Sequence, residues 1–398
     1  MNRSEPRHRV TAVDALRGLV MIIMALDHTR DFFHTDAMHF SAEDLARTTP
    51  LLFLTRWVTH LCAPVFFVTA GMAAGLRLAR GGSRSTLSRY LVTRGLWLIA
   101  VELVVMRLAM NFTVDLRYPV FLIILWALGW SMIALAGLIR LPAGVVGLIG
   151  LAIVAGHNTL DGMPASAFGP LAWVWHVLHQ PGLITVGPIS AIAGYPVLPW
   201  AGVMALGFWA SSIYTWTPGR RARALQIFGL AALAGFVVLR AWNGYGDPAP
   251  WSPQASPVMT AVSFLNTTKY PPSLMFLLMT LGPAALLLAW LERTTLGSRH
   301  PFVVFGRVPF AYYVVHFWLL HLAAALAAFL RYGVATWGFL WHPLPSMGGA
   351  REIFPADLGY PLGLVYVTWF LLVTALYPTC RWLAEVKARR RDWWLSYL

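Results

Sequence analysis

Long apolar segments recur along the whole chain, separated by turns and by clusters of charged residues. Most of them approach or exceed the roughly 20 residues that an α-helix needs to cross the hydrocarbon core of a bilayer. The predicted spans are residues 13–33, 50–76, 90–110, 118–139, 142–156, 196–216, 224–240, 272–291, 302–330 and 361–380. The pattern therefore predicts an all-α, polytopic integral membrane helical bundle with about ten transmembrane helices.

The composition supports this class and argues against a soluble globular protein. Hydrophobic residues make up 58% of the 398 positions, and charged residues make up only 12%. We expect a single domain over residues 1–398. It comprises an N-terminal segment 1–12, a membrane bundle 13–380 and a cytoplasmic amphipathic tail 381–398, whose tryptophans and basic residues suit a membrane surface.

The charge distribution predicts the orientation of the chain. The formal net charge of +14 comes from residues spread over short loops rather than from one basic face, so no nucleic acid is expected as a partner. With ten spans, nineteen basic residues fall on the side of the N-terminus and nine on the other side. Short loops rich in Lys and Arg stay in the cytoplasm, so both termini are predicted to be cytoplasmic. The protein is then a multi-pass component of the cytoplasmic (inner) membrane, in contact with membrane lipids.

The loops differ between the two sides. Three long loops, roughly 157–195, 241–271 and 331–360, fall on the outer side, where we expect the functional surface.

The two cysteines, Cys62 and Cys380, fall at opposite ends of their spans. Neither a disulfide nor a cysteine metal site is therefore expected.

Arg17 and His28 are the most informative pair of residues. They lie eleven positions apart in the first span, with an almost wholly apolar sequence between them. Eleven helical residues turn roughly 20° past three full turns and rise about 16 Å, so both side chains face the same way at two depths. Ionisable side chains at membrane depth are unfavourable unless they face a cavity or a partner. A shared functional face is therefore predicted, although either residue alone also fits an interfacial position.

His28 belongs to a cluster at the outer end of the first span. Asp27, Arg30, Asp31 and His34 surround it in sequence. An imidazole oriented by a carboxylate can act as a general base or can accept an acyl group. We therefore interpret His28 as the catalytic residue, with Asp27 or Asp31 as its orienting carboxylate. A zinc site on this cluster is disfavoured because no typical ligand spacing is present, and no metal is expected.

The second and third spans also carry ionisable residues. Arg56 and His60 lie one turn apart and share a face, and His60 suits either a functional role or a satisfied interhelical hydrogen bond. Glu102 is the only acid at depth in the third span, with Arg94 two turns towards the cytoplasm. A buried ion pair with an arginine is the expectation for Glu102.

Two later segments offer further polar groups. Asn266, Lys269 and Tyr270 precede the eighth span and suit a sugar or another polar acceptor, although the sequence there also reads as a plain turn followed by a helix start. His316 and His321 are five residues apart and point in different directions. We expect one of them to line a cavity and the other to bridge helices.

The chain resembles a known family in several places. The matching segments are Arg17-Gly followed by Met24-Ala-Leu-Asp-His28-Thr-Arg-Asp, then Thr55-Arg-Trp-Val-Thr-His60, Arg94-Gly-Leu-Trp, Asn266-Thr-Thr-Lys-Tyr-Pro-Pro-Ser and Phe305-Gly-Arg-Val-Pro-Phe. They are similar to the bacterial branch of the heparan-alpha-glucosaminide N-acetyltransferase-like membrane family. The Arg-x10-His spacing resembles that of membrane acyltransferases that acylate carbohydrates. In the animal lysosomal enzyme the catalytic histidine belongs to the loop after the first span, and here residues 37–50 offer only His39.

The resemblance implies an activity and a division of roles. Acetyl-CoA would bind from the cytoplasm, and its acetyl group would pass to an amine or hydroxyl of a carbohydrate-like acceptor on the far side. Arg17 and Arg94 are the expected cofactor-binding residues, and His28 the catalytic one. The expected substrate-binding residues are Arg30, Arg56, His60, Asn266, Lys269, Tyr270 and His316. A transporter or flippase of a polar or lipid-linked solute is the alternative, and a homodimer is compatible with the sequence.

Overall fold

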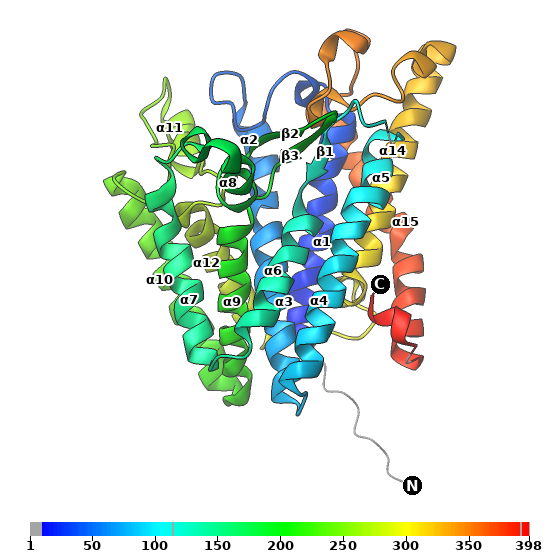
Figure 1. Ribbon diagram of the computed structural model, residues 1–398. Helices are drawn as coiled ribbons and strands as arrows, with labels where there is room; N and C mark the ends of the chain where they lie inside the picture. Colours follow the sequence, from blue (N-terminus) through cyan, green and yellow to red (C-terminus); the bar gives the residue numbers. More distant parts are fainter. Residues whose placement is uncertain (1–9, 114, 391, 398) are drawn as a thin grey trace.

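The computed structural model describes residues 10–113, 115–390 and 392–397 as a bundle of long helices with a loop-rich cap at one end (Figure 1). The helices are α1 (Thr11–Phe33), α2 (Pro50–Trp57), α3 (Cys62–Ala79), α4 (Arg84–Val101), α5 (Arg107–Asn111), α6 (Ile124–Leu138), α7 (Ala143–Gly156), α8 (Ala172–Leu178), α9 (Val197–Ala210), α10 (Pro218–Trp242), α11 (Pro257–Leu265), α12 (Leu274–Leu291), α13 (Pro301–Arg307), α14 (Pro309–Tyr332) and α15 (Leu362–Arg389). The strands are β1 (Val120–Leu122), β2 (Gly182–Val186) and β3 (Ile189–Ala193).

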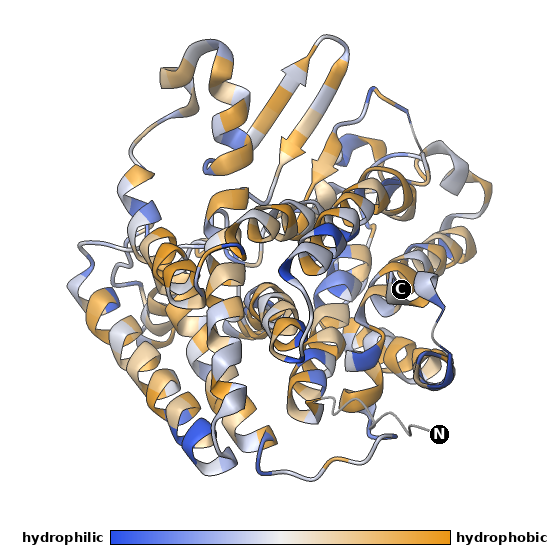
Figure 2. Ribbon diagram, turned by 60° about the horizontal axis from the view of Figure 1, so that its bottom comes forward, coloured by the Kyte–Doolittle hydropathy of each residue, from blue (hydrophilic) through white to orange (hydrophobic). Residues whose placement is uncertain are grey.

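Each of the ten predicted spans contains one helix or consecutive helices, and hydrophobic residues are frequent along the helices of the bundle (Figure 2). Among the described residues, seven helical segments are long and apolar enough to cross a membrane: Pro50–Ala79, Ala143–Leu160, Val197–Thr215, Pro218–Trp242, Leu274–Leu291, Pro309–Gly338 and Leu362–Arg389. α1 is equally long but carries charged residues at both of its ends. A helical membrane protein is thereby supported, and the number of ten crossings stays a prediction.

The structure departs from the predicted boundaries in two places. Residues 118–139 were expected to form one helix, but β1 precedes α6 and pairs in parallel with β3, to which β2 pairs antiparallel. The all-α prediction therefore missed a small three-stranded sheet, because β1 finds its partner about 70 residues later in the chain.

Near the C-terminus, α15 runs past residue 380 to Arg389. Ion pairs of Glu385 with Arg381 and Arg389, each four residues away, favour this continuation.

The two ends of the bundle differ in character. α1 begins and α15 ends at one end, here called the N-terminal side, at the bottom of Figure 1. The sheet, α8 and α11 lie at the other end, here called the loop side. The N-terminal segment 1–12 is described only from residue 10 onward, and the remainder of that predicted segment lies outside the described residues.

Close helix crossings fix the arginine–glycine pairs Arg17-Gly18 and Arg94-Gly95. A Cβ atom added to Gly18 would lie 1.7 Å from the Phe302 carbonyl oxygen of α13, and one added to Gly95 would lie 2.5 Å from the Gly129 carbonyl oxygen of α6. Only glycine permits such approaches between helix backbones. Each crossing therefore fixes the depth and direction of the arginine that precedes it, Arg17 or Arg94.

Candidate active site

A cavity of about 1790 Å³ opens on the loop side at the end of α1. Its walls come from α1, from the segment after it, from the start of the α2–α3 span and from the loop that precedes α12. The charged and titratable residues that line it are Asp27, His28, Arg30, Asp31, His39, Glu43, Arg56, Tyr195, Lys269, Tyr270, Tyr313 and Arg351. The outer end of the first span and the segment around Lys269 are thus brought together.

His28 lies in this loop-side cavity with one carboxylate beside it. Its Nδ1 atom is 4.0 Å from Asp31 Oδ2, and its ring packs 4.2 Å from the Phe317 ring, centroid to centroid. Asp31 in turn accepts a 2.6 Å hydrogen bond from Arg30. Of the two carboxylates that the sequence offered, Asp31 is the one that lies within 4.0 Å of a His28 ring nitrogen.

His316 lies directly behind His28 and does not line the cavity. The two ring centroids are 5.3 Å apart, and the His316 side chain is fully buried. Its Nδ1 is 3.0 Å from the Tyr312 carbonyl oxygen, which fixes that nitrogen as the protonated one. His321, five residues later, bridges helices as expected, with its Nδ1 2.8 Å from the Ala109 carbonyl oxygen.

Asp27 belongs to an ion-pair network that joins α1 to α2. It pairs with Arg30 at 2.9 Å and also with Arg56. Arg56 donates at the same time to Glu43 Oε1, 3.2 Å away, in the segment between the two helices. His60 Nε2 lies 2.9 Å from that same oxygen. The predicted shared face of Arg56 and His60 is confirmed, and Glu43 is the partner that both residues reach.

Glu43 is the central acid that sequence reasoning missed. Its backbone carbonyl accepts a 2.9 Å hydrogen bond from Asn266 Nδ2. His60 and Asn266 thus fix the position of Glu43 through hydrogen bonds. Neither of them lines the cavity. Burial alone would raise the pKa of Glu43, but the Arg56 guanidinium and the His60 hydrogen bond hold that pKa well below its ordinary value.

Lys269 and Tyr270 also line the loop-side cavity. The Lys269 ammonium lies 5.2 Å from the Tyr270 ring centroid, and the Tyr270 hydroxyl is 3.5 Å from that of Tyr195. Burial raises the pKa of Tyr270, but Lys269 and then Arg56 outweigh it and lower the pKa overall. Hydrogen bonds to Asp247 fix this segment. The carboxylate accepts one from Thr268 N at 2.9 Å and one from Ser273 Oγ at 2.7 Å, so the segment is more than a plain turn.

A second cavity, of about 1230 Å³, lies on the N-terminal side. Its walls are mostly apolar and carry three arginines, Arg17, Arg77 and Arg94, with no acidic residue among the lining side chains. Arg17 donates to the Gly306 carbonyl at 3.2 Å. Arg94 lies over the Phe310 ring at 5.0 Å, and Arg77 over the Tyr90 ring at 4.3 Å. Arg17 and His28 therefore line two different cavities along one face of α1.

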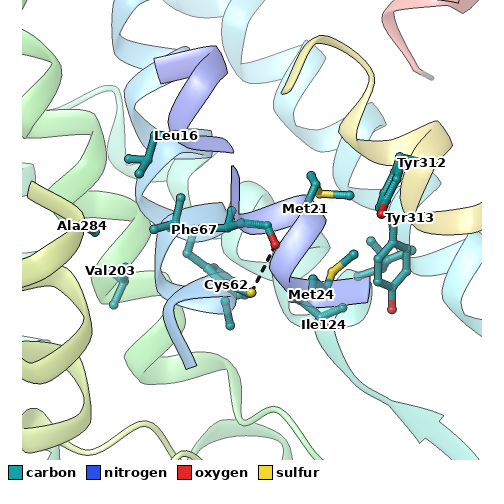
Figure 3. Close-up of a cluster of buried hydrophobic side chains, with 14 of the residues drawn as sticks. Leu16, Met21, Met24, Cys62, Phe67, Ile124, Val203, Ala284, Tyr312 and Tyr313 are labelled. Atoms are coloured by element: carbon teal, nitrogen blue, oxygen red, sulfur yellow. Dashed lines mark hydrogen bonds between the residues drawn. The ribbon is translucent and has the colours of Figure 1, made fainter. Parts of the chain in front are cut away.

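The two cavities share a wall. Phe66, Ile124 and Tyr313 line both of them. On α1, Met21 lines the N-terminal-side cavity and Met24 the loop-side cavity. Figure 3 shows these two methionines beside Ile124 and Tyr313 in the buried cluster. The partition between the cavities is thus one layer of side chains.

The ion pair predicted for Glu102 is wrong. Glu102 Oε2 accepts backbone hydrogen bonds from Leu125 N at 2.7 Å and Trp126 N at 3.2 Å, at the start of α6. A carboxylate is favourable at a helix N-terminus, whose first N–H groups lack partners within the helix. Glu102 therefore fixes the first turn of α6, which carries Ile124 into the shared wall.

These features define a class of protein: a multi-pass helical membrane protein that buries a histidine–carboxylate site on one side and a cationic apolar cavity on the other. The chain matches the family model described as "Heparan-alpha-glucosaminide N-acetyltransferase, catalytic" over residues 9–240, and it belongs to that family. No curated protein matches the chain. The family implies an acyltransferase-type membrane enzyme. The match includes Arg17, His28 and Arg94, whereas Lys269, Tyr270 and His316 lie beyond it.

Proposed function

We propose that the protein transfers an acetyl group from acetyl-CoA to an amine or hydroxyl of a carbohydrate-like acceptor on the other side of the membrane. One observation carries this proposal: the arginine-lined cavity and the His28 cavity meet at a wall only one side chain thick. The basic loops support an orientation with both termini in the cytoplasm of an inner membrane. The donor then enters from the N-terminal side and the acceptor from the loop side.

The N-terminal-side cavity has the chemistry that the donor needs. Acetyl-CoA carries several phosphates at one end and a long, largely uncharged pantetheine arm that ends in the thioester. Arg17, Arg77 and Arg94 offer cations for the phosphates, since guanidinium groups bind phosphate oxygens well. The apolar walls suit the arm. The rise from Arg17 to His28, about 16 Å, is comparable with the length of that arm, so the thioester would lie at Phe66, Ile124 and Tyr313.

His28 would move the proton in this reaction. With Nδ1 towards Asp31, its Nε2 is the nitrogen left to act. As a general base, it takes the proton of the acceptor hydroxyl or amine while the acceptor atom bonds to the acetyl carbon. The carbon–sulfur bond then breaks, and the CoA sulfur takes up a proton. In the second variant Nε2 itself accepts the acetyl group and passes it on, and the geometry supports both variants.

The loop-side cavity suits a polar acceptor. Lys269, Tyr270 and Glu43 present an ammonium, a hydroxyl and a carboxylate to one space. Such a mixture of donors and acceptors around aromatic rings binds sugar hydroxyls and amines. Arg30 and Arg56 are already held by carboxylates, so their contribution to the acceptor is to keep this wall in place.

The test uses purified protein reconstituted in vesicles with acetyl-CoA supplied to one side at a time. Cleavage of the thioester is followed with a model amino sugar on the other side. His28→Ala should lower turnover by about 10²- to 10⁴-fold, the usual contribution of an acid–base group, with acetyl-CoA binding retained. The matched control is His176→Ala, since His176 lies on α8 and lines neither of the two cavities. Undiminished turnover in His28→Ala would contradict the proposed role.

A transporter or flippase is the second candidate, because cavities at opposite ends of a bundle separated by a thin wall also suit alternating access. The same vesicles separate the two functions. Movement of a solute without acetyl-CoA, together with no saturable binding of acetyl-CoA, would favour transport.

A further inference from the structure

Three residues on the loop side form a cluster that the acetyl-transfer site does not use. His157 follows α7, Asp161 lies one turn later, and His179 follows α8. One potential ligand atom from each of the three lies within 4.8 Å of the other two. None of them lines the loop-side cavity. No metal is expected from the sequence, which does not single out these residues; Asp161 and His179 are 18 positions apart in the chain.

The hydrogen bonds of this His–Asp cluster are incomplete. His179 Nε2 is 3.0 Å from Asp161 Oδ1. His157 is only 3% exposed, yet both of its ring nitrogens lack a hydrogen bond within the described residues. The Pro272 carbonyl lies near the ring but outside hydrogen-bond geometry. Since buried polar atoms nearly always have partners, an unpaired imidazole beside a carboxylate and a second imidazole indicates a ligand.

We propose that His157, Asp161 and His179 bind a zinc ion. Two imidazoles and a carboxylate are a common zinc donor set, and a water molecule would complete the coordination. Ligand bonds of 2.0–2.1 Å give tetrahedral edges of about 3.3 Å. The contact between His179 and Asp161, at 3.0 Å, is already close to such an edge. The other ligand atoms already lie within 4.8 Å of one another, and no hydrogen bond among the described residues restrains the His157 ring.

The surroundings support the ligands as in known metal sites. Asn158 Nδ2 donates to Asp161 Oδ2 at 2.8 Å, which leaves Oδ1 facing His179. Hydrogen bonds of this kind orient metal ligands and strengthen binding. The Asn158 Oδ1 atom accepts from Leu274 N, 2.9 Å away, at the start of α12. The ion would therefore fasten the end of α7 and the end of α8 to the segment that carries Lys269 and Tyr270.

The experiment measures metal directly and needs no enzymatic assay. The full-length protein in detergent is stripped with a chelator, reloaded with Zn²⁺, desalted and analysed for bound metal, with Co²⁺ as a spectroscopic probe of the same site. We expect about one zinc per chain and a tetrahedral Co²⁺ spectrum that Zn²⁺ abolishes. A reloaded wild-type protein without bound metal, or with an octahedral cobalt spectrum, would overturn the proposal.

Variants then locate the ion. His157→Gln, Asp161→Asn and His179→Gln should each remove the stoichiometric metal, and Asn158→Ala should weaken binding by about 10- to 100-fold. His176→Gln is the matched control, since His176 lies on α8 three residues before His179 and contacts the Gln180 carbonyl instead. Zn²⁺ should raise the Tm of the wild type and of the control but not that of His157→Gln. Equal metal content in all variants that elute as folded protein would place the ion elsewhere.

Discussion

The two cavities are lined by similar numbers of basic residues, but these residues have different interaction partners. On the loop side, both arginines are in ion pairs with carboxylates of the protein itself. Arg30 pairs with Asp27 and Asp31. Arg56 pairs with Asp27 and Glu43. On the N-terminal side, Arg17 pairs with Asp14, 3.6 Å away, whereas Arg77 and Arg94 lie over aromatic rings and have no ion pair within the described residues. A neutralised charge stabilises the protein's own geometry, whereas an arginine without a carboxylate partner is available to an anionic ligand.

This difference assigns a task to each cavity. The loop-side network joins α1, α2 and the segment between them, and so it holds His28 and Asp31 in fixed positions. The N-terminal-side arginines depend on helix crossings at Gly18 and Gly95 for their placement. In the proposed function, one cavity serves the chemistry and the other binds the donor. The following substitutions test that contrast, from the largest expected effect to the smallest.

Asp27→Asn should damage stability most. Loss of this buried carboxylate weakens two arginine pairs at once, and breaking a buried ion pair typically destabilises a protein by 3–5 kcal/mol. We expect about 3 kcal/mol, because Arg30 keeps Asp31 and Arg56 keeps Glu43. Thermal or denaturant unfolding in detergent measures the change.

Asp44→Asn is the control, since its pair with Arg47 is exposed and should contribute less than about 1 kcal/mol. Equal losses would show that the loop-side network has no special structural role.

Arg17→Ala should weaken acetyl-CoA binding and leave the fold intact. A hydrogen bond to a charged group contributes about 1.5–3 kcal/mol, which corresponds to roughly 10- to 100-fold in Kd. Direct binding of labelled acetyl-CoA in nanodiscs measures the effect. Arg84→Ala is a suitable control, because Arg84 is exposed, donates to the Arg140 carbonyl and does not line the cavity. An unchanged Kd in Arg17→Ala would remove the proposed division between binding and chemistry.

The predictions from sequence succeeded where the geometry is local. Arg17 and His28 share a face because a single helix fixes their angle. Arg56 and His60 lie close together because only four positions separate them, at the point where α2 continues into a 3₁₀ turn, Val58–Leu61. The expectation for Glu102 failed because its partners are backbone N–H groups of α6, which a sequence of side chains does not reveal. Glu43 was missed because it lies in an irregular segment whose position depends on Arg56, His60 and Asn266 together.

The same argument explains the fold. Each apolar segment predicts its own helix, so the long helices could be found from hydropathy alone. The small sheet could not, since β1 and β3 are distant in sequence and their pairing is a tertiary contact. The shared wall of Phe66, Ile124 and Tyr313 is likewise built from three different helical segments.

Tyr313→Ala should connect the two cavities. Removal of this ring from the shared wall admits water from the loop side to the thioester, so hydrolysis of acetyl-CoA without an acceptor should rise severalfold. Release of free thiol in the absence of acceptor measures it. Tyr313→Phe keeps the ring and should resemble the wild type. If both variants hydrolyse acetyl-CoA at the wild-type rate, the wall does not separate donor from solvent.

Glu43→Gln should have the smallest effect, and that effect should depend on pH. The pKa of Glu43 is lowered below its ordinary value of 4.5 in the folded protein, so the unfolded chain takes up the proton first as pH falls. The stabilisation is therefore complete above about pH 4.5 and disappears below it. We expect the wild type to exceed Glu43→Gln by roughly 1 kcal/mol at neutral pH, because Glu43 is partly exposed, and the gap to close in acid. Unfolding measured across pH tests this, with the exposed Glu352→Gln as control. A gap that stays constant down to acidic pH would mean that packing, and not the charge on Glu43, holds Arg56 and His60 beside the cavity.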